Sequence, residues 1–169
     1  DSPPGDGGPA TAANLGSPLE IAFDAAGNLF ILADAPGVVR RVSVATGLIS
    51  TVAGGGTDFT SEEVPATTAL LFPRGLAVDV QGNLLLTLYD RAVRRVSTAT
   101  GRIQTIAGNN ERNFSGDGGP AIFASLNDPA GLAVDAAAGA VYIVDVGNGR
   151  LRKLTPWAQP QTAAAGPLR

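Results

Sequence analysis

The chain has 169 residues, with 12 Lys and Arg against 15 Asp and Glu, which gives a formal net charge of -3 at neutral pH. This slightly acidic balance argues against a nucleic-acid-binding surface, which is usually strongly basic. Cys and His are both absent, which excludes disulfides, thiolate chemistry and the usual general base near neutral pH.

The glycine-rich segment GDGGPA comes first, at residues 5–10, and it returns at residues 116–121. Glycine turns of this kind bind phosphate where a long helix follows them. Here the residues after each proline can support only about one turn of helix, with Pro at its start. The middle copy, at residues 62–66, lacks the glycines. We therefore expect structural loops between repeats rather than anion sites.

Four short runs with strand character follow, at residues 19–24, 28–33, 38–43 and 48–53. Turn residues rich in Gly, Asn and Pro separate each run from the next. Because the connections are short, adjacent runs are expected to pair as antiparallel hairpins. The unit therefore predicts a four-stranded meander.

This unit occurs three times, and its prolines at positions 18, 73 and 129 lie 55 and 56 residues apart. The second copy predicts strands at residues 75–79, 83–88, 92–97 and 102–107. In the first strand of each copy, large apolar residues alternate with Ala, so both faces of the sheet should be buried. A repeat of this length, whose single unit cannot bury its own faces, predicts the blades of a propeller.

Three motifs recur in the copies: GDGGPA before a unit, PxGLAVD in its first strand, and TVAG or TIAG in its last. Together with GNLFI at residues 27–31, they resemble NHL-repeat β-propellers over about residues 5–155, and residues 141–154 match best. The resemblance implies an all-β propeller fold with about three four-stranded blades in this chain. The His of the family's name is missing, and Leu88-Tyr89-Asp90 stands where the third copy has Asp145.

Propellers of this family usually close with about six blades, so we expect this chain to be part of a larger or oligomeric propeller. The third unit lacks its outer strand, and such an arc should expose two apolar blade faces and unpaired edges. We expect blades at about residues 18–54, 73–108 and 129–155, inter-blade loops at 1–17, 55–72 and 109–128, and a Pro/Ala-rich tail or linker at 156–169.

Asp24, Asp79 and Asp135 each end the first strand of a unit, before a glycine-containing turn. A carboxylate there can cap the turn by accepting a backbone N–H. A ring of such carboxylates could instead bind Ca²⁺, which takes six to eight oxygen ligands. We favour turn capping, because one Asp recurs wherever the turn recurs. Asp34 and Asp145 allow the same two interpretations, and no other metal and no cofactor is expected.

A pair of basic residues occupies the third strand of every unit, where neighbouring side chains point to opposite faces. We expect one residue of each pair to form a salt bridge between blades and the other to be solvated. A ring of guanidinium groups that recognises RNA, as in some animal relatives of the family, is disfavoured by the acidic charge. The pairs are Arg40-Arg41, Arg94-Arg95 and Arg152-Lys153.

The loops at residues 55–72 and 109–128 are the longest and the least alike, and long loops on a rigid scaffold commonly carry recognition. Their mix of aromatic, amide and charged groups suits a protein or glycan surface. The alternative is that they only cover the blade edges, with Phe59 and Phe114 tucked inward. The binding-surface candidates are Phe59, Glu62, Glu63, Asn109, Asn110, Arg112 and Phe114, and Asn113 begins a possible N-glycosylation sequon.

These features predict a non-catalytic binding or scaffold module that engages protein or glycan. The absence of Met indicates a processed chain or a segment of a longer one, and we expect a secreted or cell-surface bacterial protein that is extracellular, at the cell surface or periplasmic. Further copies of the chain, or further blades of the same protein, are the other expected partners. Nucleic acid and membrane insertion are not expected, since no apolar run approaches ~18 residues.

Two other functions stay open. The chain could be a structural subunit of an oligomeric or fibrous extracellular assembly, because its blade faces need a cover. It could also belong to a lyase- or hydrolase-type propeller enzyme whose site lies in blades missing here. The family's enzymes rely on His and bound metal, and since this chain has no His, no catalytic residue is predicted and an enzyme is disfavoured.

Overall fold

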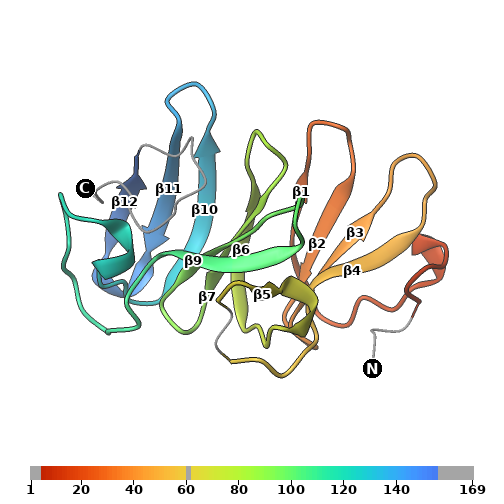
Figure 1. The fold of residues 1–169 in the computed structure, drawn as a ribbon, viewed down its shortest axis with the longest axis horizontal. Coiled ribbons are helices and arrows are strands. Elements are labelled where there is room, and N and C mark those ends of the chain that lie inside the picture. The colour runs from red at the N-terminus through yellow and green to blue at the C-terminus, as the bar shows by residue number, and fades with distance from the viewer. Residues whose placement is uncertain (1–4, 60–61, 156–169) are drawn as a thin grey trace.

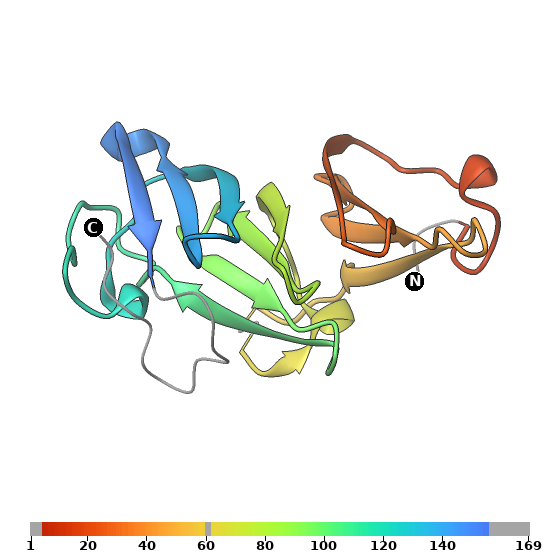
Figure 2. The same cartoon turned by 90° about the horizontal axis from the view of Figure 1, so that it is seen from above.

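The computed structural model describes residues 5–59 and 62–155 of the chain. Three antiparallel sheets follow one another along the sequence and stand side by side as adjacent blades (Figure 1). Seen from above, the sheets lie along an open arc (Figure 2). The predicted all-β propeller architecture is therefore confirmed. None of the described helices is long and apolar enough to cross a membrane.

Blade 1 is a four-stranded meander in the order β1-β2-β3-β4. Every strand begins and ends within a residue or so of the prediction, because Gly, Asn and Pro set the turns between them. A short 3-10 helix, η1 (Ala10–Ala12), precedes the blade. The strands are β1 (Pro18–Phe23), β2 (Leu29–Ala33), β3 (Val38–Val42) and β4 (Ile49–Gly54).

Blade 2 has five strands, one more than the sequence predicted, in the order β5-β9-β8-β7-β6. The extra strand, β5 (Val64–Pro65), pairs with the outer strand and lies within the segment predicted to be an inter-blade loop. A strand of two residues is too short to show the alternation of apolar and polar residues that predicts a strand. The other elements are η2 (Ala66–Thr68), β6 (Pro73–Val78), β7 (Leu84–Leu88), β8 (Val93–Val96) and β9 (Arg102–Ala107).

Blade 3 has three strands within the described part of the chain, in the order β10-β11-β12, and lacks a fourth, outer strand there, as predicted. The predicted tail at residues 156–169 lies outside the described residues. The elements are η3 (Ala121–Phe123), β10 (Pro129–Asp135), β11 (Ala140–Asp145), η4 (Val146–Asn148) and β12 (Arg150–Leu154).

Blades 2 and 3 each bury a large apolar face against the blade before them. Between blades 1 and 2, Leu76 and Leu86 pack with Phe30 in one hydrophobic cluster. Between blades 2 and 3, Leu85 packs with Ile143 in a second cluster. The alternation of large residues with Ala in the inner strands thus reflects which neighbour each face meets.

The two outward faces of the arc keep their apolar side chains exposed, as predicted. Ile21 and Phe23 of β1 are 61% and 62% exposed, whereas Leu76, at the position of Ile21 in blade 2, is 3% exposed. At the other end of the arc, Leu151 of β12 is 62% exposed and Val144 is exposed as well. Blade 1 therefore lacks the neighbour that blade 2 has.

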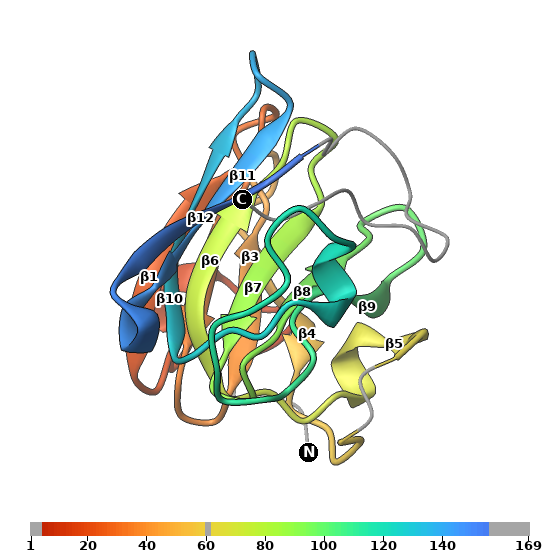
Figure 3. The ribbon, with the colours of Figure 1, turned by 90° about the vertical axis from the view of Figure 1, so that its left-hand side faces the viewer.

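The two ends of the blades differ. The β1–β2 and β3–β4 turns and their copies lie at one end, which we call the hairpin end, and the long loops before blades 2 and 3 lie at the other, the loop end (Figure 1). The loop before blade 2 contains β5, which pairs with β9, so this loop lies along the outer edge of blade 2 (Figure 3). The loops are the part of the fold that positions the candidate site.

Candidate functional site

In blade 1, a buried arginine fastens the glycine-rich loop to the blade that follows it. The side chain of Arg40 is 1% exposed, and its Nη2 lies 2.6 Å from Oδ1 of Asp6. The other oxygen of Asp6 accepts the Thr51 N–H at 3.0 Å. The loop also exchanges backbone hydrogen bonds with Ile49, so it covers the outer edge of β4. We call this contact the latch.

Blade 3 has the same latch with an additional carboxylate. Nη2 of Arg152 lies 2.7 Å from Asp117 and its Nη1 lies 3.2 Å from Asp145, which is fully buried. Arg152 also donates to the backbone carbonyls of Ser125 and Ser115. Both GDGGPA segments are therefore structural loops, as the sequence predicted.

The buried residue of each basic pair is ion-paired, but the predicted partner was wrong. The sequence predicts a bridge from blade to blade. Instead, the carboxylates lie in the loop before the blade or within the blade itself, because the glycine-rich loop folds back over the third strand. The second residue of each pair is half-buried.

In blade 2 the latch is incomplete. Glu62 stands where blade 1 has Asp6, and it accepts the N–H and the hydroxyl of Thr105, which corresponds to Thr51. Arg94, which corresponds to Arg40, forms no ion pair with Glu62 and pairs with Asp90 four residues earlier, at 2.7 Å. The loop carboxylate that holds the arginine in blades 1 and 3 is thus missing.

A pocket of about 670 Å³, which we call the loop pocket, opens at this incomplete latch. It brings together four predicted recognition residues with three that the sequence analysis missed. The predicted residues are Phe59, Glu62, Asn109 and Asn110, and the missed ones are Phe72, Asp90 and Arg94. The departure of Leu88-Tyr89-Asp90 from the third repeat was the signal that could have identified Asp90.

Two charged side chains that line the loop pocket each keep a buried atom without a partner among the described residues. The Arg94 side chain is 5% exposed, and its Nε is unpaired within residues 5–59 and 62–155, as is the Nε of Arg40 and of Arg152 in the complete latches. Oδ1 of Asp90 is likewise buried without a partner in those ranges, while Oδ2 pairs with Arg94. Two exposed aromatic rings complete the pocket, since Phe59 is 77% and Phe72 is 53% exposed.

Asn109 has a structural role in the loop pocket. Its amide Nδ2 donates to the Phe123 carbonyl and to the Ser125 hydroxyl, both at 3.2 Å, and its Oδ1 accepts the Glu111 N–H. These bonds hold the start of the loop at residues 109–128 against its end. Asn109 therefore shapes the wall of the pocket.

The other predicted binding residues do not line the loop pocket. Arg112 donates from Nε to the Asn127 side chain at 3.1 Å. Phe114 is half-buried, with the guanidinium of Arg150 at 3.9 Å from its ring centre. Glu63 has an exposed side chain, and its carbonyl accepts from Arg102.

Of the two loop aromatics, Phe59 is 77% exposed and is not tucked inward, whereas Phe114 is half-buried. Phe114 also lies 4.8 Å from the guanidinium of the buried Arg152, so it covers a latch. Asn113, next to it, is exposed, and its glycosylation stays a prediction.

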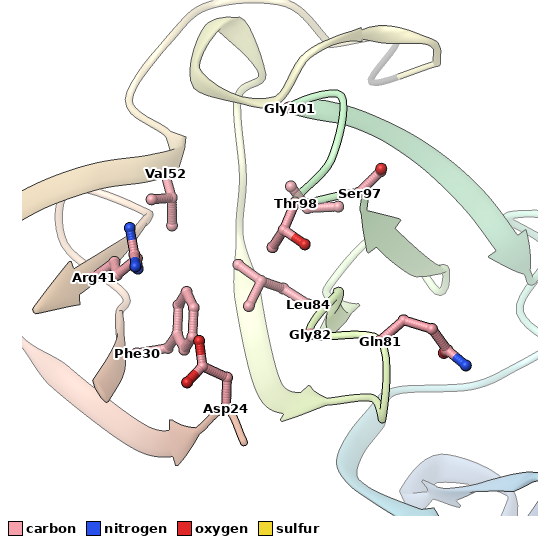
Figure 4. A pocket seen from close by; sticks show the side chains of 11 residues that line it. Asp24, Phe30, Arg41, Val52, Gln81, Gly82, Leu84, Ser97, Thr98 and Gly101 are labelled. Carbon is pink, nitrogen blue, oxygen red and sulfur yellow. The ribbon is translucent and has the colours of Figure 1, made fainter. Parts of the chain in front are cut away.

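A second pocket, of about 410 Å³, lies at the hairpin end between blades 1 and 2 (Figure 4). Asp24 and Arg41 line it from blade 1, and Gln81 and Thr98 from blade 2. The carboxylate of Asp24 is occupied, because it accepts the N–H groups of Ala26 and Asn28 and the Asn28 amide. The bond from the Asn28 side chain lowers the pKa of Asp24 below its ordinary value of 3.8.

The same turn recurs in the other blades. Asp79 accepts the N–H groups of Gln81 and Asn83, and Asp135 accepts the Ala138 N–H. These are the turn-capping bonds that the sequence predicted. Residues 5–59 and 62–155 contain no group of three or more acidic side chains arranged to hold a metal ion.

The other two acidic residues for which we weighed turn capping against Ca²⁺ differ from each other. Asp145 is a latch residue, which accepts from Arg152 and from the Asn127 N–H. Asp34 has an exposed side chain. Asp145 is therefore held by a buried arginine rather than by its own turn alone.

Comparisons with known proteins agree with this architecture. Residues 126–154 match the model of the NHL repeat, which confirms the resemblance to NHL-repeat propellers at blade 3. A search of curated protein sequences gives no match.

Solved structures show the same fold at low identity. A protein of unknown function from Bacteroides thetaiotaomicron is 20% identical, with a TM-score of 0.66 over 85% of this chain and 35% of its own. An auxiliary nutrient binding protein from Bacteroides ovatus is 23% identical, with a TM-score of 0.62 over 79% of this chain and 36% of its own. A gluconolactonase from Xanthomonas campestris is 20% identical, with a TM-score of 0.57 over 92% of this chain and 47% of its own. The chain therefore spans between a third and a half of the length of each.

Proposed function

We propose that this chain is a non-catalytic recognition module that binds its ligand, a protein or a glycan, at the loop pocket. The carrying observation is that Arg94, a buried cation, lacks there the loop carboxylate that its counterparts have. Arg94 keeps one carboxylate partner, Asp90, and a ligand that enters the pocket takes the place of the absent loop carboxylate.

The surroundings of Arg94 support this role. A pocket of about 670 Å³ lies in the range of small-molecule sites, which combine aromatic walls with a few polar groups. Long loops on a rigid scaffold form its rim, where recognition residues commonly lie. The structural similarity to a nutrient binding protein is in keeping with a binding role.

A loop exchange tests the proposal. Substituting Ser61→Gly, Glu62→Asp, Glu63→Gly and Val64→Gly gives blade 2 the latch sequence of blade 1. The new carboxylate should reach Arg94 and fill the pocket. In a binding screen against peptides and oligosaccharides, the wild-type chain should bind a ligand that the exchanged chain binds at least about tenfold more weakly.

The control is Glu111→Gln, an exposed change in the other long loop that does not line the loop pocket. It should bind like wild type. If every ligand binds the exchanged chain as well as it binds the wild type, or if no ligand binds at all, the loop pocket is not a recognition site.

The enzyme alternative has its own assay. Because one structural relative is a gluconolactonase, hydrolysis of δ-gluconolactone is the reaction to measure, by acid release in a pH-stat. We expect no rate above spontaneous hydrolysis, since the chain has no His and its described acidic side chains form no metal cluster. A rate that requires Asp90 or Glu62 would contradict the non-catalytic proposal.

A second candidate function, a structural subunit, is favoured by the apolar faces at the two ends of the arc. The position of Ile21 in blade 2 is held by Leu76, which is buried by blade 1. A second copy of the chain that places its Leu151 face on β1 would reproduce this blade-to-blade packing. The resulting contact runs head to tail, as it does between blades within the chain.

Light scattering after size-exclusion chromatography decides this candidate. Assembly predicts a species larger than the 17.0 kDa chain, which Ile21→Asp should return to monomer. The control Val80→Asp changes an exposed residue at the β6–β7 turn of blade 2 and should leave the mass unchanged. A wild-type chain that is monomeric at all concentrations contradicts self-assembly.

A further inference from the structure

We infer that the loop pocket binds a neutral sugar ring, whose hydroxyl groups bond to the carboxylates and the guanidinium that line the pocket. This inference rests on the proposed function and specifies its ligand. It follows from three properties of the pocket: the hydrogen-bond donors and acceptors of its lining, the mixed charge of that lining, and its aromatic walls.

The lining calls for a ligand that both donates and accepts hydrogen bonds. The carboxylates of Glu62 and Asp90 can only accept, and the guanidinium of Arg94 can only donate. Asp90 and Arg94 lie together, because Oδ2 of the first and Nη2 of the second are 2.7 Å apart. A hydroxyl group can donate to a carboxylate and accept from a guanidinium.

The balance of charge favours a neutral ligand. The carboxylates of Asp90 and Glu62 line the pocket together with the guanidinium of Arg94. Nη1 of Arg91 donates to the carbonyl of Asn110, a lining residue, at 3.1 Å, so a second guanidinium lies next to the pocket. An acidic ligand would meet two carboxylates, and a cationic ligand would meet the guanidinium of Arg94, with that of Arg91 nearby. A hydroxyl group satisfies both kinds of partner without adding charge.

The walls suit the apolar face of a sugar ring. Phe59 and Phe72 are the two exposed aromatic side chains among the described residues that line the pocket. Aromatic rings contribute a large contact area at a low cost in side-chain entropy. A pyranose has C–H groups on the faces of its ring and hydroxyl groups around its edge. It can therefore contact an aromatic wall and the polar lining residues together.

The experiment is an NMR titration of the isotopically labelled chain with the methyl glycosides of glucose, galactose and mannose. At least one should shift the amide signals of the loops that line the pocket. Phe59→Ala should weaken the Kd roughly tenfold, and Asp90→Asn roughly tenfold to a hundredfold. Phe59 is highly exposed, so its removal leaves the fold intact even if Asp90→Asn does not. The control is Phe23→Ala, a similarly exposed aromatic on β1, which should bind like wild type.

The outcomes separate this inference from the proposed function. Tighter binding of glucuronate or of an acidic peptide than of the neutral glycosides overturns the neutral sugar and keeps the pocket as a binding site. The neutral sugar is also overturned if no glycoside binds while a peptide from the screen binds the wild-type chain and not the loop-exchanged chain. In that case the pocket remains a binding site. Glycoside binding that survives both Phe59→Ala and the loop exchange overturns the inference and the proposed function together.

Discussion

Blades 1 and 2 share a period, a strand order and a hairpin-end turn, yet their loop ends differ. In blade 1, Asp6 closes the space over Arg40, whereas in blade 2 the corresponding Glu62 turns to Thr105 and a pocket stays open over Arg94. The two acidic residues differ by one methylene group and by the glycines around them. The comparison shows how a repeat protein can gain a site: one copy of a structural contact is left incomplete.

The strongest latch should give the largest loss of stability. Arg152→Met leaves Asp145, which is fully buried, without its cation. Removing one partner of a buried ion pair costs about 3–5 kcal/mol in the free energy of unfolding, which urea denaturation measures. Arg150→Met removes an exposed arginine from the same strand and the same aromatic ring, at a cost of about 1 kcal/mol or less. Equal losses of stability in the two variants would mean that the buried ion pairs of Arg152 contribute no more than the exposed side chain of Arg150.

The two loop carboxylates should differ when each is neutralised. Asp6→Asn removes the charge that pairs with the buried Arg40 and should cost about 1.5–3 kcal/mol. Glu62→Gln changes an exposed residue bonded to Thr105 and should cost about 1 kcal/mol or less. Urea denaturation of both variants measures the difference. A larger cost for Glu62→Gln would show that the blade 2 latch is complete.

The backbone of the blade 2 loop should gain stability from a glycine. Glu63 has a φ of 55°, in the left-handed region, where its counterpart Gly7 has a φ of 79°. Glu63→Gly should therefore raise the free energy of unfolding by about 0.5–1 kcal/mol, the strain released less the added chain entropy. Gly7→Ala should lower it by about 1 kcal/mol, because the new Cβ meets no described atom within 4 Å and only φ opposes it. Thermal unfolding of both variants measures the pair.

The smallest effect is expected at the hairpin end, where the blades agree. The folded pKa of Asp24 is lowered from 3.8, chiefly by the Asn28 side chain. The folded state therefore binds fewer protons than the unfolded state around and below pH 3.8, and stability falls as the pH drops through the folded pKa. Asp24→Asn should flatten this dependence when urea denaturation at about pH 3 is compared with that at about pH 6. If Asp24→Asn leaves the pH dependence of stability unchanged, folding does not lower the pKa of Asp24.

The sequence predicted the blades far better than the site. Period, turn residues and alternation are local signals, so the strands of blades 1 and 2 were placed correctly. The partner of Arg40 depends on how a loop with several glycines folds back, and composition does not determine that path. Phe59, Glu62 and Asn110 were identified as loop residues of suitable chemistry. Asp90 was noticed only as a departure from the repeat pattern, and its ion pair with Arg94 was recognised only from the structure.

The latches also show where one module of this chain stops and the next begins. Asp6 and Asp117 bond to the strands that come after them, so each loop is fastened to the blade on its C-terminal side. A portable cassette therefore consists of a loop followed by its blade, and its natural seams lie just after the outer strands, near Gly54 and Gly108. Chimaeras joined at these glycines keep every buried arginine with its own carboxylate. Chimaeras joined just before β1 or β10 separate Asp6 from Arg40 or Asp117 from Arg152.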